Sequence, residues 1–118
     1  MLTIDALRTY GANVEEGLER MMNNEAFYLR MVNMILNDTS AVKLRAAVEA
    51  GELNTGFEVA HALKGIAGNL SLTPLYDKTV EITELLRAGT EMDYGPLLDG
   101  IDQEFARIHE LAGLGGEQ

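Results

Sequence analysis

The sequence predicts an all-α fold, an up-and-down four-helix bundle preceded by extra short N-terminal helices. Apolar residues recur with the helical period in every long segment, and no segment alternates in the manner of a strand. Residues that start or stop helices separate these segments. With 118 residues, 47% hydrophobic and 24% charged, the chain has the size of one domain with a single core. We expect residues 1–118 to form that domain, with residues 1–22 as a helical cap and residues 113–118 as a frayed tail.

Two short helices are expected before the bundle. Thr3 can cap the first of them, which would end at Gly11. Asn13, followed three residues later by Glu16, resembles a capping box and would start the second helix. Asn23 interrupts the pattern and marks its end. We expect these two helices to cover one end of the bundle.

The four bundle helices should start near Glu25, Thr55, Pro74 and Pro96. In an alternative arrangement, the segment Ala41–Ala50 is a full member of the core and the last helix is peripheral. Both arrangements are all-α, because every long segment has the same period of 3.6 residues.

Capping signals set the boundaries between these helices. Asp38–Ser40 reads as a stop followed by a new cap, and Thr55–Glu58 reads as a capping box. Thr73 would cap the next helix, with Pro74 at its first position, and Gly89 would end it. The expected apolar seams of the four helices are Phe27, Met31, Met34 and Ile35, widened by Tyr28, Val32 and Leu36; Val59, Leu63, Ile66 and Leu70; Leu75, Thr79, Ile82 and Leu86; and Leu97, Ile101, Phe105 and Ile108. The methionines expected in the core are Met21, Met22, Met31, Met34 and Met92.

A ridge around His61 is the first candidate site. On a helix, His61 falls opposite the seam, and Phe57, Lys64, Gly65 and Gly68 lie within roughly 60° of it. Each glycine costs about 0.5–1 kcal/mol relative to alanine in a helix interior. Two of them beside the histidine therefore indicate a surface that is kept open for another molecule to approach closely.

The run His61-Ala62-Leu63-Lys64-Gly65, followed by Ala67-Gly68-Asn69-Leu70, resembles the central motif of histidine-containing phosphotransfer (HPt) domains. That motif reads His-x-Leu-Lys-Gly, then small residues, then an apolar residue and a glycine. The resemblance extends over most of the chain, from Val14 to the helix ending near Ala88. The family often has glycine ten residues after the histidine, where this chain has Ser71.

The resemblance implies a phosphorelay intermediate. His61 would accept a phosphoryl group from, and donate it to, the aspartate of response-regulator receiver domains, with a hybrid sensor histidine kinase as a further partner. Lys64, three residues on along the same face, would offset the charge of the phosphohistidine. Phe57, Gly65 and Gly68 would form the docking surface for the partner. We expect no cofactor of the chain's own, because the Mg²⁺ would be carried by the receiver domain.

Composition and the absence of certain motifs disfavour several other classes of function and location. A net charge of −10 disfavours nucleic-acid binding, which needs clustered lysine and arginine. No phosphate-binding glycine loop or kinase motif is present. The chain has no cysteine and shows no signal peptide or membrane-spanning run. We therefore expect a cytoplasmic monomer, and the Met1 start and lack of a second domain favour a free-standing shuttle.

A metal site is not expected. Carboxylate-bridged dimetal bundles use Glu-x-x-His motifs on two helices. Glu58 precedes His61 by three residues, but Ala106 takes the corresponding place before His109. We interpret His109 and the paired carboxylates as solvated surface.

The alternative function is a helical interaction module that is not phosphorylated and binds a partner on the same face. The presence of both His61 and Lys64 favours phosphotransfer, because an adaptor needs neither.

Overall fold

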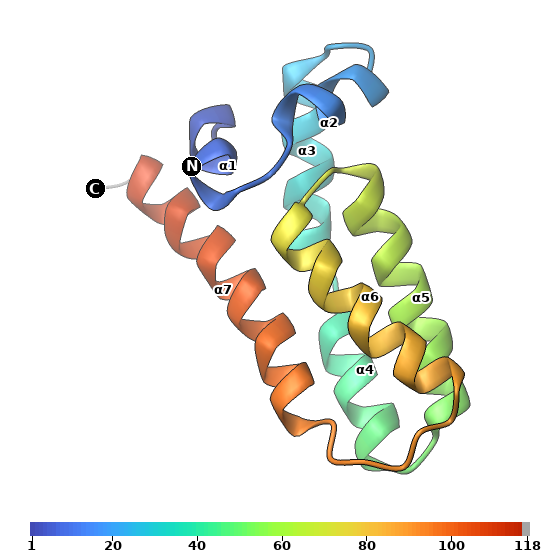
Figure 1. Cartoon of the computed structure of the whole chain (residues 1–118). Coiled ribbons are helices and arrows are strands. Elements are labelled where there is room, and N and C mark those ends of the chain that lie inside the picture. Colours follow the sequence, from blue (N-terminus) through green and yellow to red (C-terminus); the bar gives the residue numbers. More distant parts are fainter. Residues whose placement is uncertain (117–118) are drawn as a thin grey trace.

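The computed structural model describes residues 1–116, with side chains to residue 113, and it contains helices and no strand in that range. This confirms the all-α fold. The described residues form seven helices, which are labelled in Figure 1. Their bounds are Ile4–Tyr10 (α1), Val14–Arg20 (α2), Glu25–Leu36 (α3), Ser40–Glu49 (α4), Leu53–Asn69 (α5), Thr73–Arg87 (α6) and Gly95–Gly116 (α7).

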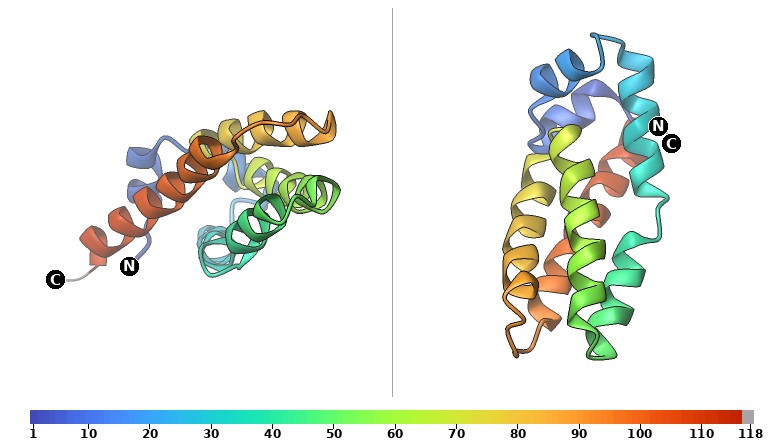
Figure 2. Two further views of the ribbon diagram at one scale, coloured as in Figure 1. Left: turned by 90° about the horizontal axis from the view of Figure 1, so that it is seen from below. Right: turned by 90° about the vertical axis from the view of Figure 1, so that its right-hand side faces the viewer.

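Four columns of helix run up and down the molecule. α5, α6 and α7 form three of them, and α3 and α4 lie end to end as the fourth (Figures 1 and 2). The break between α3 and α4 falls at Asp38, whose carboxylate accepts hydrogen bonds from the backbone N–H and hydroxyl of Ser40. The four-helix bundle is thus confirmed, but neither expected arrangement is complete: α4 is a member of the core, and α7 is not peripheral.

α1 and α2 lie at one end of the bundle (Figure 1). α1 packs against α7, where the Tyr10 hydroxyl donates to Glu104 Oε1 at 2.9 Å. Arg107 also donates to Glu104 Oε1, at 3.0 Å, and its guanidinium lies 4.9 Å from the centre of the Tyr10 ring. The amino group of Met1 donates to Ala112 O, so the N-terminus lies beside α7.

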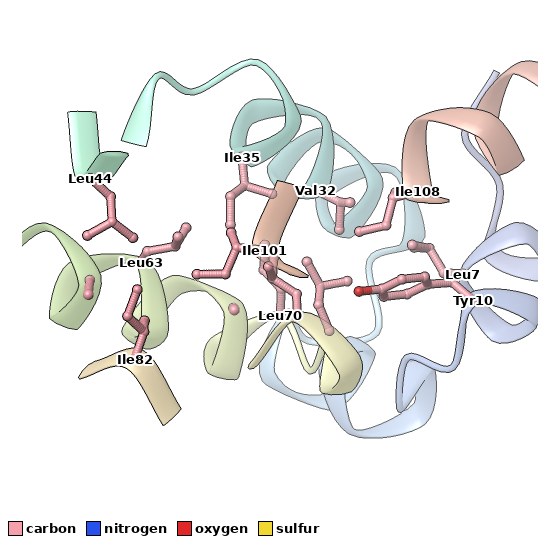
Figure 3. Packing of buried hydrophobic residues seen from close by; sticks show 14 of the residues in the cluster. Leu7, Tyr10, Val32, Ile35, Leu44, Leu63, Leu70, Ile82, Ile101 and Ile108 are labelled. Carbon is pink, nitrogen blue, oxygen red and sulfur yellow. The ribbon is translucent and has the colours of Figure 1, made fainter. Parts of the chain in front are cut away.

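The core draws on every helix of the bundle and on the two N-terminal helices, as Figure 3 shows for its central part. The predicted seams of α3 and, as described below, of α5 were partly wrong. In α3 the buried residues are Tyr28, Val32 and Ile35, while Phe27 is 38% and Met34 59% exposed. Tyr28 can be buried because its hydroxyl donates to Leu70 O at 2.8 Å. In α7 the predicted seam is confirmed: Ile101 and Ile108 are buried, and Leu97 and Phe105 are half-buried and pack against the core. Leu98 is a further buried residue of this helix.

The methionines are less buried than expected. Met22 is 89% exposed and Met92 45% exposed, and Met34 faces solvent as described above. Met22 lies in the turn after α2 with a positive φ of 56°, which turns its side chain out of the helical pattern. Only Met21 and Met31 of the five expected core methionines pack against the core, as partly buried residues.

The observed helix starts confirm some of the predicted N-caps and show that others were wrong. The side chains of Thr3 and Asn13 cap α1 and α2 as predicted. α5 starts at Leu53, so Thr55 lies inside the helix and the predicted capping box at Thr55–Glu58 is wrong. Gly51, with a φ of 77°, ends the α4 turn, and Glu52 N–H donates to Ala47 O, so the chain is already aligned for helix at Leu53.

Two further boundaries differ from the prediction. α6 begins at Thr73 with Leu72 as its N-cap residue, so Thr73 does not cap the helix and Pro74 takes the second helical position. α7 continues to Gly116, so residues 113–116 are helical where a frayed tail was expected. Residues 117–118 of that expected tail lie outside the described residues.

Candidate functional site

α5 has one side buried in the core and one side exposed, and the exposed side carries the site. The side facing the core consists of Gly56, Ala60, Leu63, Ala67 and Leu70, all buried. The small residues Gly56, Ala60 and Ala67 let α4 and α6 pack closely on α5: a Cβ at position 56 would lie 3.2 Å from Val48 Cγ2. His61 is exposed on the opposite side, as the sequence predicts.

The predicted seam of α5 was wrong in one respect. Ile66 is 39% exposed rather than buried, and Val59 is half-buried. Alanine and glycine fill the narrow space between neighbouring helices better than branched side chains do, so the core stripe passes through Ala60 and Ala67 instead. His61 thus stays on the surface, and Ile66 is a further exposed apolar residue of α5.

The ring of His61 is stacked on the ring of Phe57, one turn earlier on α5. The two ring centroids lie 5.6 Å apart and the ring planes differ by 23°. The guanidinium carbon of Arg87, at the end of α6, lies 4.8 Å from the centre of the Phe57 ring. Arg87 in turn pairs with Glu84 through two contacts of 3.3 Å each. Phe57, His61 and Arg87 thus form a contiguous aromatic and cationic group, which we call the Phe57 stack.

Lys64 and Gly65 lie on the other side of His61. Lys64 is half-buried, and none of the ion pairs among the described residues involves its ammonium group. A Cβ at Gly65 would have nothing within 4 Å. The positive charge of Lys64 is therefore available to an anion, and the surface over Gly65 is open, as the ridge hypothesis requires.

Gly68 is placed differently from the prediction. A Cβ at this position would lie 2.9 Å from Cε1 of Tyr76, so the ring of Tyr76 on α6 covers the space that we expected to be open. Gly68 is half-buried, whereas Gly65 is exposed. The glycine at position 68 thus admits a side chain of this chain itself, and only Gly65 keeps an unobstructed approach beside His61.

A shallow groove of ≈ 580 Å³ begins at Lys64 and Gly65 and runs toward α2. Its lining comes from α2, α5, α6 and the turn between the last two: Glu16, Arg20, Lys64, Gly65, Gly68, Asn69, Ser71, Thr73, Tyr76 and Asp77. The groove holds two cationic and two carboxylate side chains, so it offers a mixed polar surface next to the exposed imidazole.

Arg20 connects α2 to the end of α5 through hydrogen bonds within this groove. Its Nη1 donates to Gly68 O at 2.9 Å and to Ser71 Oγ at 2.7 Å. The Ser71 hydroxyl donates to Glu16 Oε1 at 2.7 Å. A cation at the C-terminus of a helix also interacts favourably with the helix dipole. These contacts form one wall of the groove.

The sequence reasoning missed Arg20, Tyr76 and Arg87 as neighbours of the site. Arg87 could have been found, since Phe57 and Arg87 lie at similar distances on either side of the short turn at Ser71. Residues in such positions of two antiparallel helices lie across from each other. Arg20 had no comparable signal, because its approach depends on how the N-terminal helices fold over the bundle.

The two histidines lie apart, on α5 and α7. No group of three histidine, cysteine, aspartate or glutamate side chains converges within the described residues. His109 is exposed on α7, far along the chain from the ridge.

No helix in the described part of the chain is both long and apolar enough to cross a membrane.

Comparison with known proteins identifies the family. The model of the Hpt domain matches residues 31–111, from within α3 to α7, a range that contains the Phe57 stack, Lys64 and Gly65. No curated protein and no solved structure matches the chain. The matched range covers more than half of the sequence and agrees with the helical bundle described above. The chain therefore belongs to the Hpt domain family and functions in histidine phosphotransfer within phosphorelay signalling.

Proposed function

We propose that His61 is the residue that carries the phosphoryl group. The observation that supports this choice is its setting: the imidazole is exposed on α5, whose other side is buried in the core. Beside it lie the open surface over Gly65 and Lys64, which forms no ion pair with any residue that the structure describes. His109, the other histidine, also lies in the matched range, but the residues three and four positions from it on the helix are Phe105, Ala106, Ala112 and Gly113, and none of them is a cation.

The chemistry needs little more than this setting. Imidazole is nucleophilic near neutral pH, so a ring nitrogen can attack the phosphorus of an aspartyl phosphate without a dedicated base. The N–P bond forms as the O–P bond breaks, and the aspartate leaves with the electron pair as a carboxylate. The phosphohistidine brings negative charge to the ridge, which the Lys64 ammonium offsets. The reverse steps return the phosphoryl group to an aspartate.

Two-component proteins are the partners of this family, and we propose receiver domains of response regulators or of hybrid sensor kinases as the specific ones. The partner would supply the aspartate and its Mg²⁺, since phosphoryl transfer gains from metal ions that neutralise developing charge. We further propose that the chain acts as a monomer in the cytoplasm. The sequence supports the cytoplasmic location, since it shows no signal peptide and no membrane-spanning run.

Phosphoryl transfer from a phosphorylated receiver domain to the purified chain tests this function. We expect label to appear on the wild-type protein and on His109→Gln, and to be absent from His61→Gln. Both substitutions change an exposed histidine, so the melting temperatures of the two variants should match that of the parent. Label on His61→Gln would reject His61 as the acceptor, and a complete lack of label on every variant would favour the interaction-module alternative.

Gly65→Gln tests the approach path separately. The side chain would occupy the open surface beside the imidazole, so transfer from the receiver should slow sharply while the fold is retained. Lys64→Ala should slow transfer moderately, because it removes charge without adding bulk. A Gly65→Gln variant that transfers as fast as the parent would show that the partner does not approach over this glycine.

A further inference from the structure

The Phe57 stack raises a question that the docking role predicted for Phe57 does not answer. A residue that anchors a partner should present its apolar surface to solvent. Phe57 is instead half-buried, with its ring engaged by the imidazole of His61 at 5.6 Å and by the guanidinium of Arg87 at 4.8 Å. Its largest contacts are thus within this chain.

Resting on the proposed function, we infer that Phe57 is a positioning residue that orients the His61 imidazole for phosphoryl transfer, and that Arg87 holds Phe57 in place. An exposed histidine on a helix can adopt more than one rotamer. Helical side chains lean toward the preceding turn, where Phe57 provides a ring for the imidazole to stack on. The contact therefore selects one orientation of the imidazole before a partner arrives.

The stacked orientation suits the chemistry. The lone pair of an imidazole nitrogen lies in the ring plane, so a ring covered on its face still presents its nitrogens at its edge. Phe57 lies one turn before His61 and Gly65 one turn after it, so the stack leaves the surface over Gly65 clear. Holding a nucleophile in its reactive orientation lowers the entropic part of the barrier.

Arg87 connects the stack to α6. A guanidinium over an aromatic ring within about 6 Å is an attractive contact, and here the distance is 4.8 Å. Glu84, one turn earlier on α6, holds the guanidinium through contacts from Nε and Nη2 at 3.3 Å each. The orientation of His61 is thus linked to the packing of α6 on α5.

Two phosphoryl donors separate positioning from docking. Phosphoramidate is a small donor that needs no protein surface: its P–N bond breaks, ammonia leaves, and the phosphorus bonds to His61. A phosphorylated receiver domain requires docking as well. The variants are Phe57→Leu, Phe57→Tyr, Arg87→Gln and the blank His61→Gln. Phe27→Leu is the matched control, since Phe27 is a 38% exposed phenylalanine on α3 with Arg30 6.0 Å from its ring centre.

Phe57→Leu should lower the rate of His61 phosphorylation about three- to tenfold with both donors, the range expected for losing one aromatic pair. Phe57→Tyr should keep the parent rate, because it retains the ring. Arg87→Gln should lower both rates about twofold, and Phe27→Leu should change neither. The ring-proton NMR signals of His61 should shift in Phe57→Leu, while those of His109 stay in place.

Several results would overturn the inference. If Phe57→Leu slows transfer from the receiver but not from phosphoramidate, Phe57 is a docking residue, and the proposed function of His61 still stands. Equal rates for Phe57→Leu and the parent with both donors reject the positioning role as well. If circular dichroism shows that Phe57→Leu does not fold, Arg87→Gln decides the question. A twofold loss of rate with both donors in Arg87→Gln supports the inference, and unchanged rates with both donors reject it. Label from the phosphorylated receiver on the His61→Gln blank contradicts the proposed function itself, whereas label from phosphoramidate on that blank measures the exposed His109 and is subtracted.

Discussion

Gly65 and Gly17 are both glycines inside helices, and the residues around them give opposite expectations for alanine. A Cβ at Gly65 would meet nothing within 4 Å, so Gly65→Ala should raise the free energy of unfolding by about 0.5–1 kcal/mol through helix propensity. A Cβ at Gly17 would lie 2.7 Å from Cε1 of Tyr28, whose side chain is fully buried and held by Leu70 O. Gly17→Ala should therefore lower the free energy of unfolding by about 1–3 kcal/mol.

Urea unfolding of the two variants and the parent measures this difference directly. Gly68→Ala provides an intermediate case, because the ring of Tyr76 that it would contact is 36% exposed and has room to move. Equal stability of Gly17→Ala and Gly65→Ala would show that helix propensity alone determines the change in the free energy of unfolding. The close packing of α2 on Tyr28 would then make no measurable contribution to stability.

At the scale of elements, the turn between α5 and α6 depends on Ser71. Its φ is 54°, in the left-handed region where glycine is at no disadvantage and other residues lose roughly 1–2 kcal/mol. This is the position where the family often has glycine. Ser71 is nevertheless 4% exposed and bonded through its hydroxyl to Arg20 and Glu16, which ties α2 to the turn. The hydrogen bonds thus offset the backbone strain.

We expect the two substitutions of Ser71 to differ. Ser71→Ala keeps the strain and loses the hydrogen bonds, so the free energy of unfolding should fall by about 1–3 kcal/mol. Ser71→Gly loses the same bonds but relieves the strain, so it should stay within about 1 kcal/mol of the parent. Thermal or urea unfolding of both variants makes the comparison. A Ser71→Gly variant less stable than Ser71→Ala would contradict the account of this turn.

Tyr28 links α3 to the end of α5 and should make stability depend on alkaline pH. Burial raises the pKa of the Tyr28 hydroxyl from 10.0 to about 12, and the negative charge of Glu15 adds to the shift. The hydroxyl therefore ionises first in the unfolded chain. Its contribution is fully present below about pH 10 and is lost as the pH rises from about 10 to about 12.

Tyr28→Phe isolates this effect, because it removes the ionising group but keeps the ring. The free energy of unfolding of the parent should fall relative to Tyr28→Phe between pH 9 and pH 11, when both are measured in urea at each pH. Burial also raises the pKa of Tyr10, but Tyr10 is present in both proteins and cancels in the comparison. A difference that stays constant over this range would show that Tyr28 does not ionise differently in the two states.

At the scale of the whole molecule, the sequence predicted what local patterns determine. The caps at Thr3 and Asn13, the buried face of α6 and the exposure of His61 all follow from short stretches of chain, and all are confirmed. The contacts between helices were not predictable in this way. Ile66 is exposed because neighbouring helices select small residues of α5, which no pattern within α5 reveals.

In the candidate site, too, the features set by local sequence were predicted and those set by contacts between helices were not. The motif around His61 and Lys64 predicted the ridge, because helical spacing alone brings those side chains to one face. Tyr76 over Gly68 and Arg87 over Phe57 come from α6, and Arg20 comes from α2. Their places depend on tertiary packing, so the surroundings of Gly68 and Phe57 could not be predicted from the sequence.

The N-terminal helices should be indispensable to the fold although the family match begins only at residue 31. Leu7, Tyr10 and Val14 are 0%, 1% and 0% exposed and belong to the same core as Ile108 of α7. Burying each large apolar side chain contributes about 1.5–3 kcal/mol. Losing three of them approaches the 5–15 kcal/mol that is typical of a whole domain, as an order-of-magnitude comparison.

A chain that starts at residue 23 should therefore lose its cooperative thermal transition and bind a hydrophobic dye such as ANS, because the face of α7 that α1 covers becomes exposed. Leu7→Ala in the full chain is the matched control: it removes one of the three contacts and should lower the free energy of unfolding by about 2–5 kcal/mol with the transition retained. If the shortened chain instead melts cooperatively near the temperature of the full chain, α1 and α2 are an accessory layer. Residues 31–111 would then carry their own sufficient core.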